Sequence, residues 1–194
     1  MFYFSSHPRV EYDPTGENSP QLAVDITRRF KLADFAKSSR LVYYDYQIKD
    51  RDRPDIMAET YYGNSQLDWV FFITNLIYDP YFQWPLNQSQ MEAYVRQKYG
   101  STSNALGQIH HYEQIVVPRK EYASNYDGSI IVIPEKTVIV DQTTYISLPV
   151  GSKRTVDCYA YEEALNNKKR SLRIMDKTYL PALLQEFRQV FDET

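Results

Sequence analysis

Cysteine and long apolar runs are almost absent from this sequence of 194 residues. Its single thiol, Cys158, excludes an intramolecular disulfide framework and fits folding in a reducing cytoplasm. No stretch approaches the ~20 apolar residues that a membrane-spanning helix needs. Residues 1–8 also lack the basic start and the long apolar run of a signal peptide. We therefore expect a soluble intracellular protein without a membrane partner.

Excess charge and clustered glycine are also missing. A formal net charge of -3 and a pI near 5.7 give no overall attraction to nucleic acid. The six glycines are scattered, so no phosphate-cradling loop exists and we expect no nucleotide cofactor. The densest basic run is read as a solvated helix end rather than a phosphate site. It comprises Lys168, Lys169, Arg170 and Arg173.

Catalytic and metal-binding patterns are equally scarce. His110 and His111 are adjacent on an expected strand, where they would point to opposite faces and chelate poorly. Cys158 has no CxxC partner, which favours a buried, unreactive thiol. The acids near the aromatic cluster fit solvent-facing helix positions and a turn: Asp55, Glu59, Asp68 and Asp79. We expect no catalytic residue, no metal, no cofactor and no small-molecule ligand.

Aromatic residues are abundant by contrast, with 18 tyrosines, nine phenylalanines and two tryptophans. Tyrosine supplies a large contact area with few rotamers to freeze and tolerates one wet edge, so it is favoured at protein–protein interfaces. The alternative is a core built from rings. Because so many tyrosines are hard to bury in a chain of this length, we expect a partly aromatic surface.

Helix and strand signals alternate along the first hundred residues. Residues 1–25 are expected to be extended and irregular, because prolines and a glycine interrupt them. The best signals are Pro54, which suits a first helical turn, and Gly63, which suits a left-handed helix end. The expected elements are helix 26–38, strand 41–48, helix 54–62, helix 66–74 capped by Asn64 or Ser65, helix 91–99 and a mobile loop 101–107.

The period then changes to two, which is typical of strands. The expected strands are 109–117, 129–134, 137–140 and 145–149, followed by helix 159–169, strand 171–175 and an amphipathic helix from 178 to 191. Helix 66–74 differs from the others because apolar residues cover nearly its whole circumference. Such a helix must be covered on more than one side, by this chain or by a partner.

Two runs of residues, 53–70 and 75–84, carry a family resemblance. Their marks are a proline-led helix that ends in Tyr-Gly-Asn, a helix with Gln-Leu-x-Trp-Val, and then Asn followed by Tyr-Asp-Pro-Tyr. In these marks the chain resembles the small baseplate wedge proteins of T-even-like contractile-tail phages. The resemblance is clearest from Arg40 to Tyr99 and weakest in the strand-rich stretch 108–156.

The resemblance implies an α+β fold with a small LysM-like strand–helix–helix core. Together with the residue pattern, which alone gives the strand-rich segment, it predicts an N-terminal arm with a short helix (1–40), the LysM-like core (41–100), a β-rich arm (101–157) and a C-terminal helix–strand–helix region (158–194). LysM units close with a second strand that ends in Ile-Pro, and residues 84–87 match this poorly. We therefore expect a weak or absent closing strand.

The resemblance also implies a structural role without enzyme activity, in which the chain clamps wedge subunits together and to the neighbouring wedge. The implied partners are the large wedge subunits and the adjacent wedge, with the central hub and the sheath-initiating subunit as further candidates. The implied location is the virion tail baseplate, after assembly in the host cytoplasm. The alternative is a LysM-type module that binds peptidoglycan.

Partner binding is expected at the aromatic residues of this core. Because the terminal helix has a single apolar stripe, it can cover only one side of helix 66–74. Some of Trp69, Phe72 and Ile73 should then stay available to a partner, and the N-terminal segment should order only against another subunit. The complete expected set is Tyr62, Trp69, Phe72, Ile73, Tyr78, Tyr81, Phe82 and Trp84.

Overall fold

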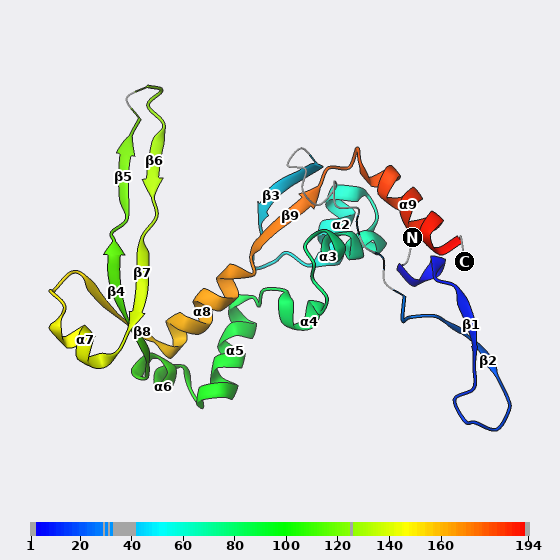
Figure 1. The fold of residues 1–194 in the computed structure, drawn as a ribbon, viewed down its shortest axis with the longest axis horizontal. Coiled ribbons are helices and arrows are strands. Elements are labelled where there is room, and N and C mark those ends of the chain that lie inside the picture. Colours follow the sequence, from blue (N-terminus) through cyan, green and yellow to red (C-terminus); the bar gives the residue numbers. More distant parts are fainter. Residues whose placement is uncertain (1–2, 29, 31, 33–41, 125, 193–194) are drawn as a thin grey trace. The chain divides into compact units, whose positions relative to one another are not determined.

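The computed structural model describes residues 3–28, 30, 32, 42–124 and 126–192 (Figure 1). The chain forms two compact units. Unit 1 comprises residues 1–87 and 167–194, and unit 2 comprises residues 88–166. Both units contain helices and strands, as expected of an α+β protein.

Unit 1 is built around a strand–helix–helix–strand arrangement. Strand β3 (Tyr43–Gln47) leads through helix α2 (Pro54–Tyr62) and the short 3-10 helix η3 (Ser65–Leu67) into helix α3 (Asp68–Thr74). The closing strand is β9 (Ser171–Met175), which pairs antiparallel with β3 from Tyr43↔Met175 to Gln47↔Ser171. Residues 84–87 form no strand, as predicted. A distant segment of the chain therefore closes the core.

Local chemistry sets the ends of α2. Pro54 begins the helix, where its missing N–H costs nothing. Gly63 ends it in the left-handed region with φ 72°, and its N–H donates to the Glu59 carbonyl at 2.9 Å. The Asn64 side chain then accepts from the Gln66 N–H at 2.9 Å and caps η3. The predicted break at Gly63 is confirmed.

Helix α9 (Leu180–Asp192) covers the core of unit 1 with the predicted apolar stripe. Phe187 is fully buried among the rings of Tyr3, Phe30, Trp69 and Phe191. The 3-10 helix η1 (Tyr3–Ser6) also packs against α9. The start of the N-terminal segment therefore packs on its own chain, and the expectation that the segment orders only against another subunit stays a prediction.

A hairpin replaces the irregular structure expected before residue 25. Strands β1 (Arg9–Tyr12) and β2 (Gln21–Val24) pair antiparallel. The Asp13 carboxylate organises their connection, because it accepts from the backbone N–H groups of Gly16 and Asn18 at 2.9 and 2.8 Å. In the predicted helix 26–38, residues 26–27 form a turn instead, and most of the rest lies outside the described residues.

Unit 2 combines helices with a three-stranded sheet of order β7-β4-β8. Beyond this sheet, β5 and β6 continue the β4–β7 pair as a two-stranded ribbon (Figure 1). The elements of unit 2 are α5 (Gln88–Tyr99), α6 (Thr102–Gly107), β4 (Ile109–Val117), β5 (Lys120–Ala123), β6 (Ile130–Ile133), β7 (Lys136–Val140), α7 (Gln142–Ser147), β8 (Lys153–Asp157) and α8 (Cys158–Lys168). The last two residues of α8 lie beyond the end of unit 2 at Asn166.

Two segments of unit 2 differ from expectation because of their caps. The predicted loop 101–107 contains α6, since the Ser101 hydroxyl accepts from the Asn104 N–H and Ala105 is buried. The predicted strand 145–149 lies largely in α7, which Asp141 caps through the N–H groups of Thr143 and Thr144. Strands β5 and β8 were not predicted.

The adjacent histidines also differ from expectation. The pairing of β4 with β8 is irregular between Ile109 and His111, and the Nδ1 atoms of His110 and His111 lie 2.8 Å apart. The His110 ring stacks on Tyr161. The prediction that His110 and His111 point to opposite faces of a regular strand is therefore wrong, because a bulge interrupts the pleat.

A buried carboxylate joins α5 to α8 in unit 2. Glu162 is 5% exposed and accepts hydrogen bonds from Lys98 Nζ at 2.6 Å and from the Tyr99 hydroxyl at 2.8 Å. The Tyr94 hydroxyl donates to it at 3.3 Å. Although burial raises the pKa of Glu162, these hydrogen bonds outweigh it and hold the pKa below its usual value. The carboxylate is therefore ionised at neutral pH.

The unit boundaries cross two of the four predicted segments, since they fall within 41–100 and within 158–194. The four-segment division into domains stays a prediction. Among the described residues, no helix is both long and apolar enough to cross a membrane.

Candidate partner-binding surface

The end of helix α3 is joined to strand β9 by one amide side chain. Asn75 Nδ2 donates to the Arg173 carbonyl at 2.8 Å, and the Arg173 N–H donates to Asn75 Oδ1 at 2.8 Å. The side chain thus imitates a strand neighbour and fixes the point where the chain leaves α3. Leu76 follows with φ 56°, a left-handed conformation that costs a non-glycine residue about 1–3 kcal/mol.

The segment after Leu76 is held by a short helix, α4 (Pro80–Gln83). Asp79 caps it, accepting from the Tyr81 N–H at 3.1 Å and the Phe82 N–H at 3.4 Å. From the other end, the Gln83 side-chain oxygen accepts from the N–H groups of Tyr78 and Asp79 at 2.6 and 2.8 Å. Side chains at both ends therefore fix the backbone of residues 78–83.

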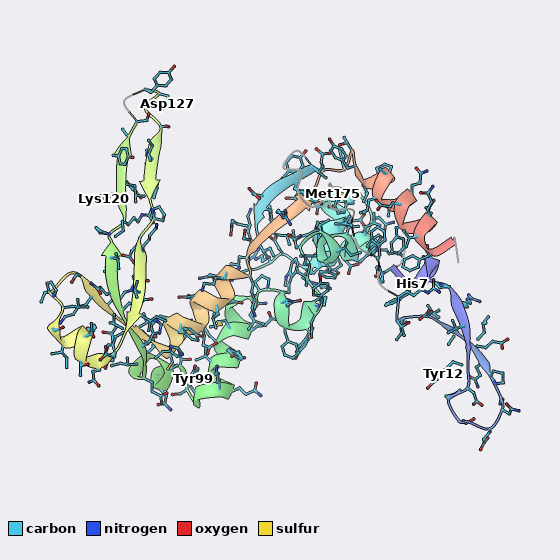
Figure 2. All side chains as sticks on the ribbon, in the orientation of Figure 1. His7, Tyr12, Tyr99, Lys120, Asp127 and Met175 are labelled. Carbon is cyan, nitrogen blue, oxygen red and sulfur yellow. The ribbon has the colours of Figure 1, made fainter. Side chains whose placement is uncertain are left out.

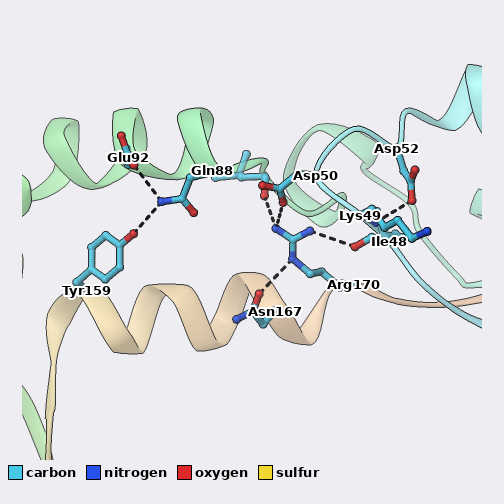
Figure 3. A network of polar contacts seen from close by, with 10 residues as sticks. Ile48, Lys49, Asp50, Asp52, Gln88, Glu92, Tyr159, Asn167 and Arg170 are labelled. Carbon is cyan, nitrogen blue, oxygen red and sulfur yellow. Dashed lines mark hydrogen bonds and ion pairs between the residues drawn. The ribbon is translucent and has the colours of Figure 1, made fainter.

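Cationic residues after α8 hold this segment from a second side. Lys169 Nζ donates to the Phe82 carbonyl at 2.8 Å. The Arg170 guanidinium donates to the carbonyls of Ile48 and Leu86 and to the Asp50 carboxylate at 2.6 Å (Figure 3). Charge-assisted bonds of this kind are stronger than neutral ones. Lys169 and Arg170 therefore bind other segments of unit 1 instead of forming a solvated helix end, whereas Lys168 is exposed as expected.

Trp84 supports the segment from the core side. Its ring meets Phe72 edge to face, with 6.1 Å between ring centroids. Both rings are half-buried and pack on the apolar core of unit 1. Trp84 therefore anchors the residues that precede it to the core of unit 1.

Three rings project from this fixed segment into solvent. Tyr81 is 83% exposed, Phe82 68% and Tyr78 61%, and the neighbouring Leu76 is also exposed. Tyr81 and Phe82 contact each other edge to face. We call Leu76, Tyr78, Tyr81 and Phe82 the aromatic patch. Large exposed apolar groups on a fixed backbone are typical of an interaction surface.

The remaining predicted residues lie deeper. Tyr62, Phe72, Ile73 and Trp84 are half-buried against the core. Tyr62 stacks on Phe71 and donates its hydroxyl hydrogen to the Met175 carbonyl at 3.2 Å. Burial raises the pKa of Tyr62 above its usual value. These four residues support the unit 1 core, and the structure does not place them in the aromatic patch.

Trp69 requires a correction. It is 5% exposed and packs between Tyr3 and Phe187 of its own chain. Sequence reasoning assigned one covering element to its helix, whereas η1 and α9 together cover this ring. Trp69 therefore belongs to the core and is not available to a partner at the surface.

The chemistry of the patch is limited to contact. The Asp79 carboxylate is engaged in the cap of α4, and the exposed members of the patch carry no basic or acidic group. Within the described ranges, no three His, Cys, Asp or Glu side chains gather closely enough to hold a metal ion. The patch can bury apolar area and accept or donate hydrogen bonds through two tyrosine hydroxyls.

Comparison with known proteins identifies the family. The family model described as base plate wedge protein 53 matches residues 2–127, more than half of the chain. The chain is also 26% identical to the baseplate wedge protein gp53 of Enterobacteria phage T4 over 202 aligned positions, which cover 98% of this chain and 96% of that protein. The chain belongs to the baseplate wedge protein 53 family. It is a structural protein of the virion tail baseplate, and other baseplate proteins are its partners.

Proposed function

We propose that this chain clamps wedge subunits together by docking the aromatic patch on another baseplate wedge protein. The observation that supports this is the exposure of Tyr78, Tyr81 and Phe82 on a backbone that is already fixed. Preordered rings lose little conformational entropy when they are buried, so their burial favours association. A large wedge subunit and the neighbouring wedge are the proposed partners, with the hub and the sheath-initiating subunit as further candidates.

The LysM resemblance fits this role as a scaffold. Strand β3, helices α2 and α3, and strand β9 follow the strand–helix–helix–strand order of a LysM unit. In this proposal the strand–helix–helix–strand module holds the aromatic patch in place and binds no glycan. The family assignment gives no support to the peptidoglycan-binding alternative, and we do not propose it. Saturable binding of the chain to purified sacculi, lost in Tyr81→Ala, would contradict this choice.

We further propose that the chain assembles in the host cytoplasm and has no catalytic activity. The acids singled out in the sequence all have structural partners: Asp79 caps α4, Asp55 pairs with Arg53 at 2.8 Å, Glu59 accepts from the Ser65 N–H at 2.8 Å, and Asp68 accepts from the Trp69 N–H at 2.9 Å. A hydrolase needs two carboxylates that face one cleft. Asp55 and Asp68 do line one pocket, but each is already engaged, with Arg53 and with the Trp69 N–H. These engaged acids support a contact role.

The experiment is co-expression of the chain with the other wedge proteins of the same phage. Truncating a buried aromatic anchor costs about 2–4 kcal/mol, which weakens binding roughly 30- to 1000-fold. We expect Tyr81→Ala and Phe82→Ala to fold normally and to reduce the yield of the assembled wedge, measured by size-exclusion chromatography and subunit composition.

Tyr12→Ala is the matched control, because Tyr12 is an exposed ring of unit 1 outside the patch. It should assemble at wild-type yield. Assembly of both patch variants at wild-type yield would show that the patch is not the clamp surface. A wild-type chain that stays monomeric with every wedge protein would overturn the clamp proposal.

A further inference from the structure

The ribbon of β5 and β6 in unit 2 exposes apolar side chains on both faces. Opposite residues of an antiparallel pair share a face, so Tyr122 and Ile131 lie on one face while Glu121 and Val132 lie on the other. Ile130 is 71% exposed, and Ile131 and Val132 are exposed as well. An isolated two-stranded hairpin is marginally stable in water. The ribbon therefore presents apolar area that a further strand would cover.

The two edges of the ribbon differ in charge. Strand β5 carries Lys120 and Glu121, and Glu121 forms an ion pair with Arg119. Figure 2 labels Lys120 on β5 and Asp127 at the tip of the ribbon. Strand β6 reads Ile-Ile-Val-Ile and has no charge. Charged residues protect an edge strand from pairing with another chain, so β5 is protected and β6 is not.

The hydrogen-bond pattern shows which β6 groups face outward. The Ser124 N–H donates to the Ser129 carbonyl at 2.7 Å, so this pair is hydrogen-bonded. Because such pairs alternate, the N–H and C=O groups of Ile131 point toward β5, and those of Ile130 and Val132 point away from it. An incoming strand would thus meet two pairs of outward donors and acceptors.

We infer that β6 binds an extended, uncharged, β-branched segment of another wedge protein, which adds to the ribbon as a third strand. This inference rests on the proposed structural function. The charges of residues 118–136 balance, with Arg119, Lys120 and Lys136 against Glu121, Asp127 and Glu135, so the ribbon has no net attraction for nucleic acid. Backbone pairing supplies the affinity, and the Ile and Val side chains select an apolar strand.

A second copy of this chain fits the β6 edge less well. Two copies related by a two-fold axis would pair symmetrically about one residue. Pairing centred on Ile131 places Glu135 opposite Asp127 of the other copy, and like charges directly opposite are destabilising. Pairing centred on Val132 places Ile130 opposite Pro134, which has no N–H to donate. Pairing centred on Ile130 places Val132 opposite Gly128, whose φ of 70° belongs to the turn and not to a strand. A strand of different sequence avoids these conflicts.

The test uses the full chain, free and co-assembled with the other wedge proteins of the same phage, with amide hydrogen exchange as the readout. In the free chain we expect protected amides at Ile131 and Ile133 and fast exchange at Ile130 and Val132. In the complex, exchange at Ile130 and Val132 should slow at least about tenfold, because their amides gain partners. Unchanged exchange at both amides in an assembled complex overturns the inference and leaves the clamp proposal standing.

Two proline variants test the β5 edge and the β6 edge of the ribbon separately. Val132→Pro removes an outward N–H on the β6 edge, and Glu121→Pro removes the outward N–H of the opposite residue on the β5 edge. Both should keep the ribbon, checked by exchange at Ile131. We expect Val132→Pro to weaken assembly about 10- to 100-fold and Glu121→Pro to leave it nearly unchanged. Equal effects of the two variants, or slow exchange at Val132 caused by self-association of the free chain, overturn the inference.

Discussion

Different interactions stabilise the core of each of the two units. The core of unit 1 is apolar and rich in rings, and Phe71, Val70, Leu172, Ile174 and Phe187 are all at most 2% exposed. Among the described residues of unit 2, four apolar side chains are buried, and two polar residues are buried with them. The four are Met91, Val95, Ala105 and Cys158, and the two are Glu162 and Asn166.

This difference has consequences for stability. Apolar burial stabilises unit 1 by an amount that depends little on pH, because no charge changes. Unit 2 relies on strand ladders and on the ionised Glu162 with its partners Lys98 and Tyr99. Burial and the Glu162 hydrogen bond raise the pKa of Tyr99 to about 12. The units should therefore respond differently to core truncation and to acid.

The largest expected effect is truncation of the unit 1 core. Phe187→Ala removes a fully buried ring whose centroid lies 4.7 Å from that of Trp69. Large-to-small changes of this kind cost about 3–5 kcal/mol. Urea denaturation measures the loss, and site-resolved hydrogen exchange should show lost protection in β3 and β9 while β4 and β8 keep theirs.

Val190→Ala is the control for this change, since Val190 lies on the exposed side of the same helix. It should change stability by less than about 0.5 kcal/mol. Equal loss of protection in both units after Phe187→Ala would mean that they unfold as one, and the comparison would fail.

A smaller effect is expected from the polar joint of unit 2. Glu162→Gln keeps the shape of the side chain and removes the charge that Lys98 neutralises. Removing one partner of a buried pair costs about 3–5 kcal/mol, but Lys98 is half exposed and regains water. We therefore expect about 1–2 kcal/mol, measured as lost amide protection in α5 and α8. Glu163→Gln, at an exposed neighbouring position, should have no measurable effect.

The same carboxylate gives a pH test with a defined sign. The pKa of Glu162 is lower in the folded chain than its usual value of 4.5. Its contribution is therefore present above pH 4.5 and is lost as the pH falls through the lower folded pKa. The stability difference between wild type and Glu162→Gln should shrink on acidification below pH 4.5. A difference that stays constant down to pH 2 would show that the charge of Glu162 does not stabilise unit 2.

Local signals allowed much of unit 1 to be predicted from the sequence. Pro54 and Gly63 act through backbone geometry alone, so both ends of α2 were readable. The pairing of β3 with β9 was not, because no local signal specifies which of several distant strands will close a sheet. The caps Ser101 and Asp141 were readable signals for α6 and α7 that strand periodicity obscured.

The candidate site likewise contains residues that the sequence predicted and residues that it did not. The rings Tyr78, Tyr81 and Phe82 were predicted as contact residues, and they are exposed. Trp69 was misplaced because its cover comes from η1 and α9, at opposite ends of the chain. The left-handed Leu76 had no sequence signal, since leucine rarely adopts positive φ. Gln83 and Lys169 hold the segment through contacts that periodicity does not reveal.

The smallest expected effects come from two glycines, one in each unit, and they should have opposite signs. No atom lies within 4 Å of an added Cβ at Gly63 or at Gly107, so neither alanine would clash. Gly63 has φ 72°, and an alanine there costs about 1 kcal/mol of left-handed strain. Gly107 ends α6 without positive φ, so an alanine there should stabilise by about 0.4–1 kcal/mol through the unfolded chain. Urea denaturation of Gly63→Ala and Gly107→Ala measures both. Destabilisation by both variants would mean that α6 also needs a glycine at position 107. A positive φ would then not explain the difference between the two glycines.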